Sequence, residues 1–173
     1  GGQLWGNGPG YKVAFEDDGI RFVPALGRHT NGDASLRFRL ESVGRESVVP
    51  TLAAKPTMSV DGTTVHYTRP DFVESYEVRC DGVEQSFTFT KLPPGSGDLI
   101  VRGRIDTSLT STADGIGDLD RLGFEVADHG GVSFDGVFGI DARGARVSGS
   151  MRLEDGVIEL VLPAEFADGA ALP

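Results

Sequence analysis

Two polar side chains interrupt the apolar faces of two neighbouring segments that alternate with a period of two. Glu74 falls in phase with the apolar residues of the segment 72–78, and Gln85 falls in phase with those of the segment 83–89. A polar group on the buried face of a strand needs a hydrogen-bond partner or a ligand. With the aromatic and acidic residues nearby in the sequence, they form a candidate ligand-binding set of Tyr67, Asp71, Glu74, Tyr76 and Gln85.

Three interpretations of this candidate set remain open. In the first, which we favour, Glu74 and Gln85 are structural and hydrogen-bond to backbone at a sheet edge or to neighbouring groups. In the second, the set binds carbohydrate, because aromatic rings cover sugar rings while carboxylate and amide groups bind the hydroxyls. In the third, a glycan-active enzyme uses Glu74 with Asp71 or Glu84 as paired carboxylates, although Glu84 alternates out of phase with Glu74.

An acidic, glycine-containing stretch between residues 106 and 120 is the best candidate for a metal site. Asp114, Asp118 and Asp120 are spaced so that a loop can direct their oxygens onto one hard cation such as calcium. A calcium loop with alternating aspartates would also place acids at Thr110 and Thr112. We therefore favour a solvated acidic loop, keep calcium as the alternative, and expect no other cofactor.

Other chemical signatures are missing from the sequence. It contains no Gly-x-Ser-x-Gly, His-Glu-x-x-His or phosphate-binding glycine motif, and its three histidines are isolated. Its one cysteine, Cys80, excludes an internal disulfide and is interpreted as a small apolar side chain in a strand. The net charge of −10 argues against nucleic acid as a partner. No apolar run approaches the roughly 18 residues that cross a bilayer, so we expect no membrane insertion.

Asp-Gly dipeptides mark the turns that would position these residues. The chain has 25 glycines, and Asp-Gly recurs between alternating runs, which is a strong hairpin signal. If each dipeptide forms a two-residue loop, opposite charges meet on one face and apolar groups on the other. The expected pairs are Glu16 with Arg21 and Phe15 with Phe22 around Asp18-Gly19; Arg79 with Glu84 and Tyr76 with Phe87 around Asp81-Gly82; and Arg152 with Glu159, Leu153 with Ile158 and Met151 with Leu160 around Asp155-Gly156.

The same period of two continues outside the hairpins and sets the fold class. Apolar residues alternate with charged ones over 36–41 and over 99–105, and no stretch indicates a helix. We predict an all-β fold, an antiparallel β-sandwich or open barrel-like arrangement of about a dozen strands joined by Asp-Gly hairpins. We expect one domain over residues 1–173, whose ends look cut from a longer chain.

A family resemblance rests on three groups of residues. They are the run Val65 to Val78 (VHYTRPDFVESYEV), the run Gly82 to Phe89 (GVEQSFTF) followed by Pro93-Pro94, and the run Phe138 to Gly144 (FGIDARG) before a final hairpin. The pattern resembles an N-terminal β-rich domain of large bacterial secreted or cell-surface proteins that carry FG-GAP-like or other β-propeller repeats. Glu84-Gln85-x-Phe87 is its most distinctive part.

The resemblance implies an extracellular or cell-surface location and a non-catalytic role. It is typical of a structural or interaction module whose partners are other domains of the parent chain or a surface protein. Binding of a polysaccharide by the candidate ligand-binding set is the alternative function. The resemblance carries over no catalytic residues.

Overall fold

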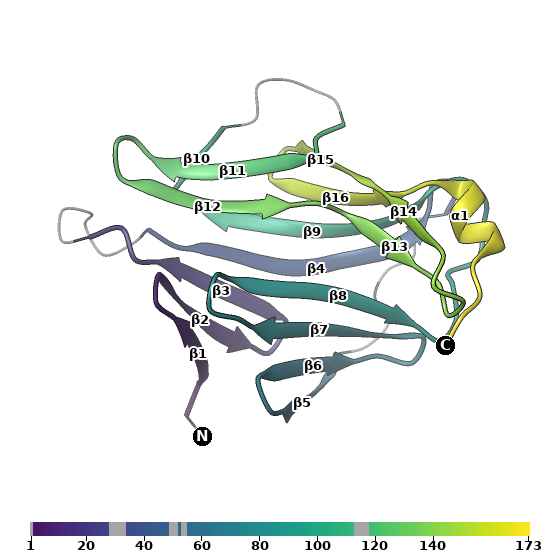
Figure 1. Cartoon of the computed structure of the whole chain (residues 1–173), viewed down its shortest axis with the longest axis horizontal. Helices are drawn as coiled ribbons and strands as arrows, with labels where there is room; N and C mark the ends of the chain where they lie inside the picture. Colours follow the sequence, from purple (N-terminus) through teal and green to yellow (C-terminus); the bar gives the residue numbers. More distant parts are fainter. Residues whose placement is uncertain (1, 28–33, 49–51, 53–54, 113–117) are drawn as a thin grey trace.

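Sixteen strands and one short helix make up the described part of the chain in a computed structural model (Figure 1). It describes residues 2–27, 34–48, 52, 55–112 and 118–173. The elements are β1 (Leu4–Gly8), β2 (Tyr11–Glu16), β3 (Gly19–Pro24), β4 (Leu36–Arg45), β5 (Thr57–Asp61), β6 (Thr64–Thr68), β7 (Phe72–Val78), β8 (Val83–Phe89), β9 (Leu99–Thr107), β10 (Thr110–Ser111), β11 (Arg121–Val126), β12 (Gly130–Asp135), β13 (Phe138–Ile140), β14 (Arg146–Ser148), β15 (Ser150–Glu154), β16 (Val157–Leu162) and α1 (Ala164–Gly169).

Seven strands form the largest sheet, in the order β1-β2-β3-β4-β9-β16-β15, and every neighbouring pair is antiparallel. The other strands form a four-stranded sheet (β5-β6-β7-β8), a three-stranded sheet (β10-β11-β12) and the β13-β14 hairpin. In Figure 1 the four-stranded and three-stranded sheets lie over different halves of the seven-stranded sheet. The predicted all-β, sandwich-like fold is confirmed, and none of these sheets closes into a barrel.

One hydrophobic core lies between these layers. The seven-stranded sheet contributes Val13 and Phe38, the four-stranded sheet contributes Phe72, and the three-stranded sheet contributes Leu122 and Phe124, all at most 7% exposed. These positions follow from the alternation of the strands, because successive side chains point to opposite faces of a sheet. On the other face of the seven-stranded sheet, β4 and β9 carry charged residues, including Arg37, Arg39 and Arg104.

The final hairpin has the predicted register. Arg152 lies opposite Glu159, Leu153 opposite Ile158 and Met151 opposite Leu160. The loop residues Asp155 and Gly156 have φ values of 49° and 74°, which is the left-handed conformation that a type I′ turn requires. Here the dipeptide itself forms the loop.

The other two predicted registers are wrong by two residues. Phe15 lies opposite Ile20 rather than Phe22, because Asp17 and Asp18 form the loop. Gly19 belongs to β3, where a Cβ atom would lie 2.0 Å from the Phe38 carbonyl oxygen, so the close approach of β4 requires glycine there. Glu16 and Arg21 nevertheless share a face and form an ion pair at 3.5 Å.

The turn at Asp81-Gly82 is wider than predicted. Tyr76 lies opposite Gln85 rather than Phe87, and four residues, 79–82, connect β7 to β8. Arg79 still contacts Glu84 as an ion pair, although the two are not cross-strand partners. Cys80 lies in this turn and is exposed, so its interpretation as an apolar strand residue is wrong.

Candidate functional site

Four residues of the predicted ligand-binding set lie together on the core-facing side of the four-stranded sheet. Tyr67 lies opposite Glu74, and Tyr76 lies opposite Gln85. Tyr67 and Tyr76 are each 1% exposed, Glu74 is 2% exposed, and the two tyrosine rings pack edge to face with centroids 5.8 Å apart. The ring faces are therefore covered by protein and leave no open platform for a sugar ring.

The carboxylate of Glu74 is fully hydrogen-bonded within the protein. Its Oε1 accepts hydrogen bonds from the Tyr76 hydroxyl and from Gln85 Nε2, the latter at 3.1 Å. Its Oε2 accepts from Arg69 Nη1 at 3.0 Å, and the Arg69 guanidinium lies over the Phe72 ring at 5.5 Å from the centroid. We call Arg69, Glu74, Tyr76 and Gln85 the buried polar cluster. Ligand binding by its members stays a prediction. The hydrogen bonds observed here join residues of the protein to one another, as in the structural interpretation.

Burial also sets the acidity of this cluster. It raises the pKa of the Glu74 carboxyl, although hydrogen bonds from Tyr76, Arg69 and Gln85 act in the opposite direction. Burial and the nearby Glu74 charge raise the pKa of Tyr76 well above its ordinary value, so Tyr76 remains a hydrogen-bond donor. A carboxyl with a raised pKa suits general acid chemistry, but a catalytic group must also reach its substrate. The oxygens of Glu74 instead face protein donors.

Asp71 and Glu84 lie apart from the buried polar cluster. Asp71 is exposed in the turn before β7, where its backbone oxygen accepts hydrogen bonds from the amides of Thr90 and Lys91 at 3.0 and 3.1 Å. Glu84 is exposed and pairs with Arg79. The structure therefore does not bring Glu74, Asp71 and Glu84 together as paired carboxylates on one open surface.

Two tyrosine hydroxyls form hydrogen bonds between the four-stranded sheet and the seven-stranded sheet. Tyr67 Oη lies 2.7 Å from the Glu16 carbonyl oxygen and 3.1 Å from that of Gly19, in the β2-β3 hairpin. In the reverse direction, Tyr11 Oη of β2 lies 2.6 Å from the carbonyl oxygen of Arg79 in the β7-β8 turn. Tyr11 was not identified from the sequence as a residue that joins two sheets. The signal was its alternation in phase with Val13, which places the tyrosine on the core-facing side, where its hydroxyl needs a hydrogen-bond acceptor.

The predicted metal residues are only partly described. Asp114 lies outside the described residues. Asp118 accepts a hydrogen bond from Arg152 Nε at 2.6 Å, and this bond lowers the pKa of Asp118. Asp120 is exposed, and its backbone oxygen accepts a hydrogen bond from the Gly136 amide. Within the described ranges no three His, Cys, Asp or Glu side chains gather as a metal site. Calcium binding by this loop stays a prediction.

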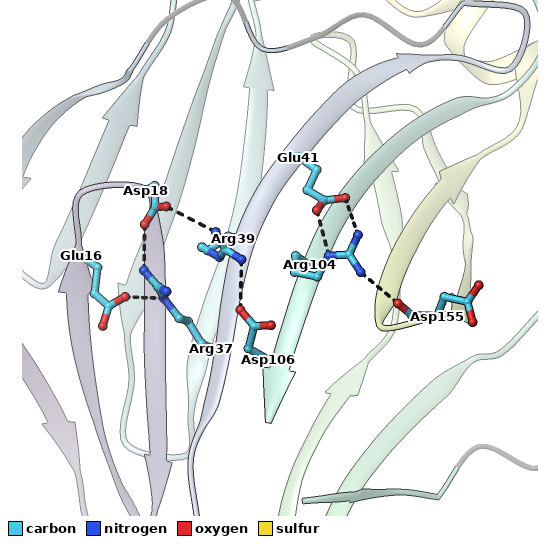
Figure 2. Close-up of polar contacts among 8 residues, drawn as sticks. All are labelled: Glu16, Asp18, Arg37, Arg39, Glu41, Arg104, Asp106 and Asp155. Atoms are coloured by element: carbon cyan, nitrogen blue, oxygen red, sulfur yellow. Dashed lines mark hydrogen bonds and ion pairs between the residues drawn. The ribbon is translucent and has the colours of Figure 1, made fainter. Parts of the chain in front are cut away.

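A row of charged residues crosses the outer face of the seven-stranded sheet (Figure 2). Arg37 lies between Glu16 and Asp18, at 2.5 and 3.2 Å. Arg39 lies between Asp18 and Asp106, at 3.9 and 3.1 Å. We call the whole set the charged row: Glu16, Asp18, Arg37, Arg39, Glu41, Arg104, Asp106 and Asp155.

At the far end of the charged row, Arg104 lies between one carboxylate and a backbone oxygen. Arg104 Nε contacts Glu41 at 2.8 Å, and its Nη1 donates to the Asp155 backbone oxygen at 2.9 Å. The side chains of Arg37, Arg39 and Arg104 are 37%, 37% and 34% exposed. A guanidinium carries five N–H donors, so each arginine keeps donors for a further partner. The alternation over 36–41 contained this signal, but it was used only to assign a strand.

The single tryptophan lies at one end of this face. Trp5 of β1 is 47% exposed and lies opposite Ala14, which is fully buried. The Arg21 guanidinium lies 5.6 Å from the centroid of the Trp5 ring. A shallow hollow beside it is lined by Trp5, Gly6, Asn7 and Lys12. An exposed aromatic ring next to amide and ammonium groups is a surface that takes both apolar and hydrogen-bonding ligands.

Asp141 is a second buried carboxylate that sequence reasoning missed. Its Oδ1 accepts from the amides of Arg143 and Ala145 at 2.9 Å each, and its Oδ2 accepts from Arg143 Nε at 2.9 Å and the Ala171 amide at 3.2 Å. Burial by itself raises the pKa of Asp141, but these donors outweigh it and lower that pKa to about 2. Asp141 thus ties the turn after β13 to the C-terminal segment.

Comparisons with known proteins add no relative. No family model, no curated protein and no solved structure matches the chain. The resemblance to N-terminal domains of bacterial surface proteins therefore stays a prediction. Among the described residues no helix is long and apolar enough to span a membrane.

Proposed function

We propose that this domain is a non-catalytic interaction module that binds its partner through the outer face of the seven-stranded sheet. The observation that carries the proposal is the charged row, in which three half-exposed arginines cross neighbouring strands on an open face with unused N–H donors. Trp5 and Arg21 extend the same face, and Trp and Arg are the residue types most enriched in binding hot spots. The carboxylates of Glu74 and Asp141 support the same proposal, because their oxygens accept hydrogen bonds from other groups of the protein.

The chemistry of the face suggests the kind of partner. Arg37 and Arg39 each lie between two carboxylates, and Arg104 pairs with the Glu41 carboxylate, so the face presents alternating charges rather than one sign. Such a pattern favours a partner with its own alternating polar groups, such as another protein domain, over a polyanion. We propose other domains of a parent chain or a surface protein as the partner, at an extracellular location.

Binding to cells of the producing organism tests this proposal. Labelled wild-type domain should be retained on the cells, and Arg39→Glu should reduce retention at least tenfold because it reverses the central charge of the row. Lys91→Glu makes the same change of charge at an exposed site on the four-stranded side and should bind as wild type does. Equal retention of both variants, or none of the wild type, contradicts the proposal. Prior protease treatment of the cells should abolish retention when the partner is a protein.

Carbohydrate binding is the second candidate function, and Trp5 rather than the tyrosines favours it. Its exposed ring and the neighbouring Asn7 and Lys12 supply the stacking surface and hydrogen-bonding groups that the buried Tyr67 and Tyr76 do not offer. Because Trp5 is the only tryptophan, its fluorescence reports this site alone. A saturable spectral shift on titration with soluble polysaccharides, weakened in Lys12→Ala, would support this candidate. An unchanged spectrum across the panel would contradict it.

A further inference from the structure

Strand β5 extends beyond the layer that covers the rest of its sheet. It is an edge strand that pairs with β6, and all five of its residues are exposed. Met58 and Val60 lie opposite Tyr67 and Val65 and so point to the core-facing side. Their partners are 1% and 3% exposed, whereas Met58 and Val60 are 45% and 55% exposed. Two large apolar side chains are thus left uncovered on this edge strand.

The backbone of β5 is open along the same edge. Asp61 and Thr64 close the β5-β6 hairpin around a two-residue loop, so the pair they form is a hydrogen-bonded one. Pairs alternate along an antiparallel ladder, so the amide and carbonyl groups of Met58 and Val60 point away from β6. They have no hydrogen-bond partner among the described residues. β5 also contains no proline, lysine or bulge of the kinds that protect edge strands.

We propose that β5 pairs with β5 of a second copy of this chain, antiparallel and about a twofold axis at Ser59. In this register Met58 lies opposite Val60 of the second copy, and the reverse, so the open groups make four hydrogen bonds. If the register shifts by two residues in either direction, only two of these hydrogen bonds remain within the strands. The other open backbone groups then face Pro56, which has no amide hydrogen, or the turn residue Gly62.

The side chains are complementary in the same register. On the inner face Met58 meets Val60 of the second copy, so four uncovered apolar side chains shield one another. On the outer face Asp61 meets Thr57 and Ser59 meets Ser59, so no like charges lie opposite each other. A twofold interface must be complementary to itself, and this strand meets that condition. The contact is small, so the dimer is expected to dissociate in the micromolar to millimolar range.

Sedimentation over a range of protein concentrations tests the pairing. The wild type should shift from monomer to dimer as concentration rises. Val60→Lys puts a charge next to Met58 of the second copy and should remain monomeric at every concentration. Ile140→Lys removes an exposed apolar residue of β13, 67% exposed, and should dimerise as the wild type does. A wild type that stays monomeric overturns the proposal and leaves the edge to a strand from another protein. A dimer that is disrupted by Ile140→Lys but not by Val60→Lys also overturns it.

Cross-linking tests the register. In a Cys80→Ser background, Ser59→Cys should form a disulfide-linked dimer under mild oxidation, because Ser59 would face itself in a non-hydrogen-bonded pair with Cα atoms about 4.5 Å apart. Ser86→Cys on β8, at the other edge of the sheet, is the control and should cross-link far more slowly. Equal rates overturn the proposal. The pairing does not depend on the proposed function, since Arg39→Glu should lose partner binding and still dimerise.

Discussion

The buried polar cluster shows how one carboxylate holds several groups. Glu74 is the shared acceptor for Arg69, Tyr76 and Gln85, and each donor is itself buried or partly buried. A buried ion pair contributes little net stability when complete, but removing one partner leaves the other unpaired in a medium of low dielectric constant. The structural role of Glu74 can therefore be measured as a loss of stability.

Glu74→Ala should lower the free energy of unfolding by about 3–5 kcal/mol, because it leaves the Arg69 charge and the Tyr76 hydroxyl without their acceptor. Urea denaturation of the wild type and variant measures this difference. The matched control is Glu77→Ala on the same strand, whose carboxylate is 43% exposed and pairs with Arg79. That variant should lose less than about 1 kcal/mol. Equal losses in the two variants would contradict a structural role for Glu74.

Asp141 should make stability depend on acid pH. Its pKa is about 2 in the folded protein, below the ordinary 3.8, so ionised Asp141 stabilises the fold above about pH 4. This contribution is lost as the pH falls toward 2. The pKa of Glu74 is raised instead, so its contribution has the opposite sign, present in acid and lost as the pH rises through its folded pKa. The two carboxylates therefore act against each other.

Asp141→Asn should be less stable than the wild type near pH 7, and the two should converge as the pH falls from about 4 to 2. Urea unfolding at a series of pH values measures the gap. Asp135→Asn is the control, because Asp135 is 60% exposed and pairs with the exposed Arg121. This control should differ little from the wild type throughout. A gap for Asp141→Asn that stays constant down to pH 2 would contradict the assignment.

At the scale of elements, turns decide the registers. The dipeptide Asp-Gly forms the loop at Asp155-Gly156, whereas at 18–19 its glycine belongs to a strand. At 81–82 the turn is widened to four residues, and its carbonyl groups bind the Tyr11 hydroxyl of the other sheet. A local dipeptide signal identifies a turn, but contacts from distant strands fix which residues occupy its corners.

Gly156→Ala should lower the free energy of unfolding by about 1 kcal/mol, because a Cβ atom is strained at a φ of 74°. Gly10→Ala is the matched control, since Gly10 has no heavy atom within 4 Å of a built Cβ and no positive φ. That substitution should be neutral or slightly stabilising, because it reduces the freedom of the unfolded chain. Thermal or urea unfolding compares the two, and a loss in Gly10→Ala equal to that in Gly156→Ala would contradict the turn assignment.

A bulge in β4 changes which residues face the core. The register shifts between Leu40 and Ser42, so Val43 and Arg45 point inward after it. Arg45 is 3% exposed, donates to the Gly97 carbonyl oxygen at 2.9 Å and pairs with Asp168 of α1 at 2.5 Å. Strict alternation predicts strand 36–41 correctly and would put the later residues on the wrong face.

At the scale of the whole molecule, the core joins all three larger sheets. Buried residues of the seven-, four- and three-stranded sheets belong to one contiguous cluster, and the hydroxyls of Tyr11 and Tyr67 connect the first two sheets. A contiguous core favours cooperative unfolding. The prediction of one domain over residues 1–173 can be tested on this basis.

Unfolding should be a single transition for every probe. Trp5 fluorescence reports the edge of the seven-stranded sheet, near-ultraviolet circular dichroism reports the packed tyrosines, and far-ultraviolet circular dichroism reports the strands. Their urea midpoints should coincide. Tyr11→Phe should move all the midpoints together, because its hydroxyl joins two sheets. Separate midpoints in the wild type would show independent units and contradict the single-domain prediction.

The sequence by itself determined the all-β class, the strands over 36–41 and 99–105, the final hairpin and the gathering of Glu74 with Tyr76 and Gln85. These features depend on alternation and turn residues, which are local properties of the chain. They require no knowledge of which strands are neighbours.

Only the tertiary structure decided what these residues contact. Arg69 and Asp141 gained their roles from the folded arrangement, and the charged row arose because strands distant in sequence became neighbours in one sheet. The uncovered face of β5 depends on where the opposing sheet ends, which no single segment encodes. Long-range pairing and layer overlap follow from the packing of the whole chain, so sequence reasoning found Glu74 and missed Asp141 and the outer surfaces.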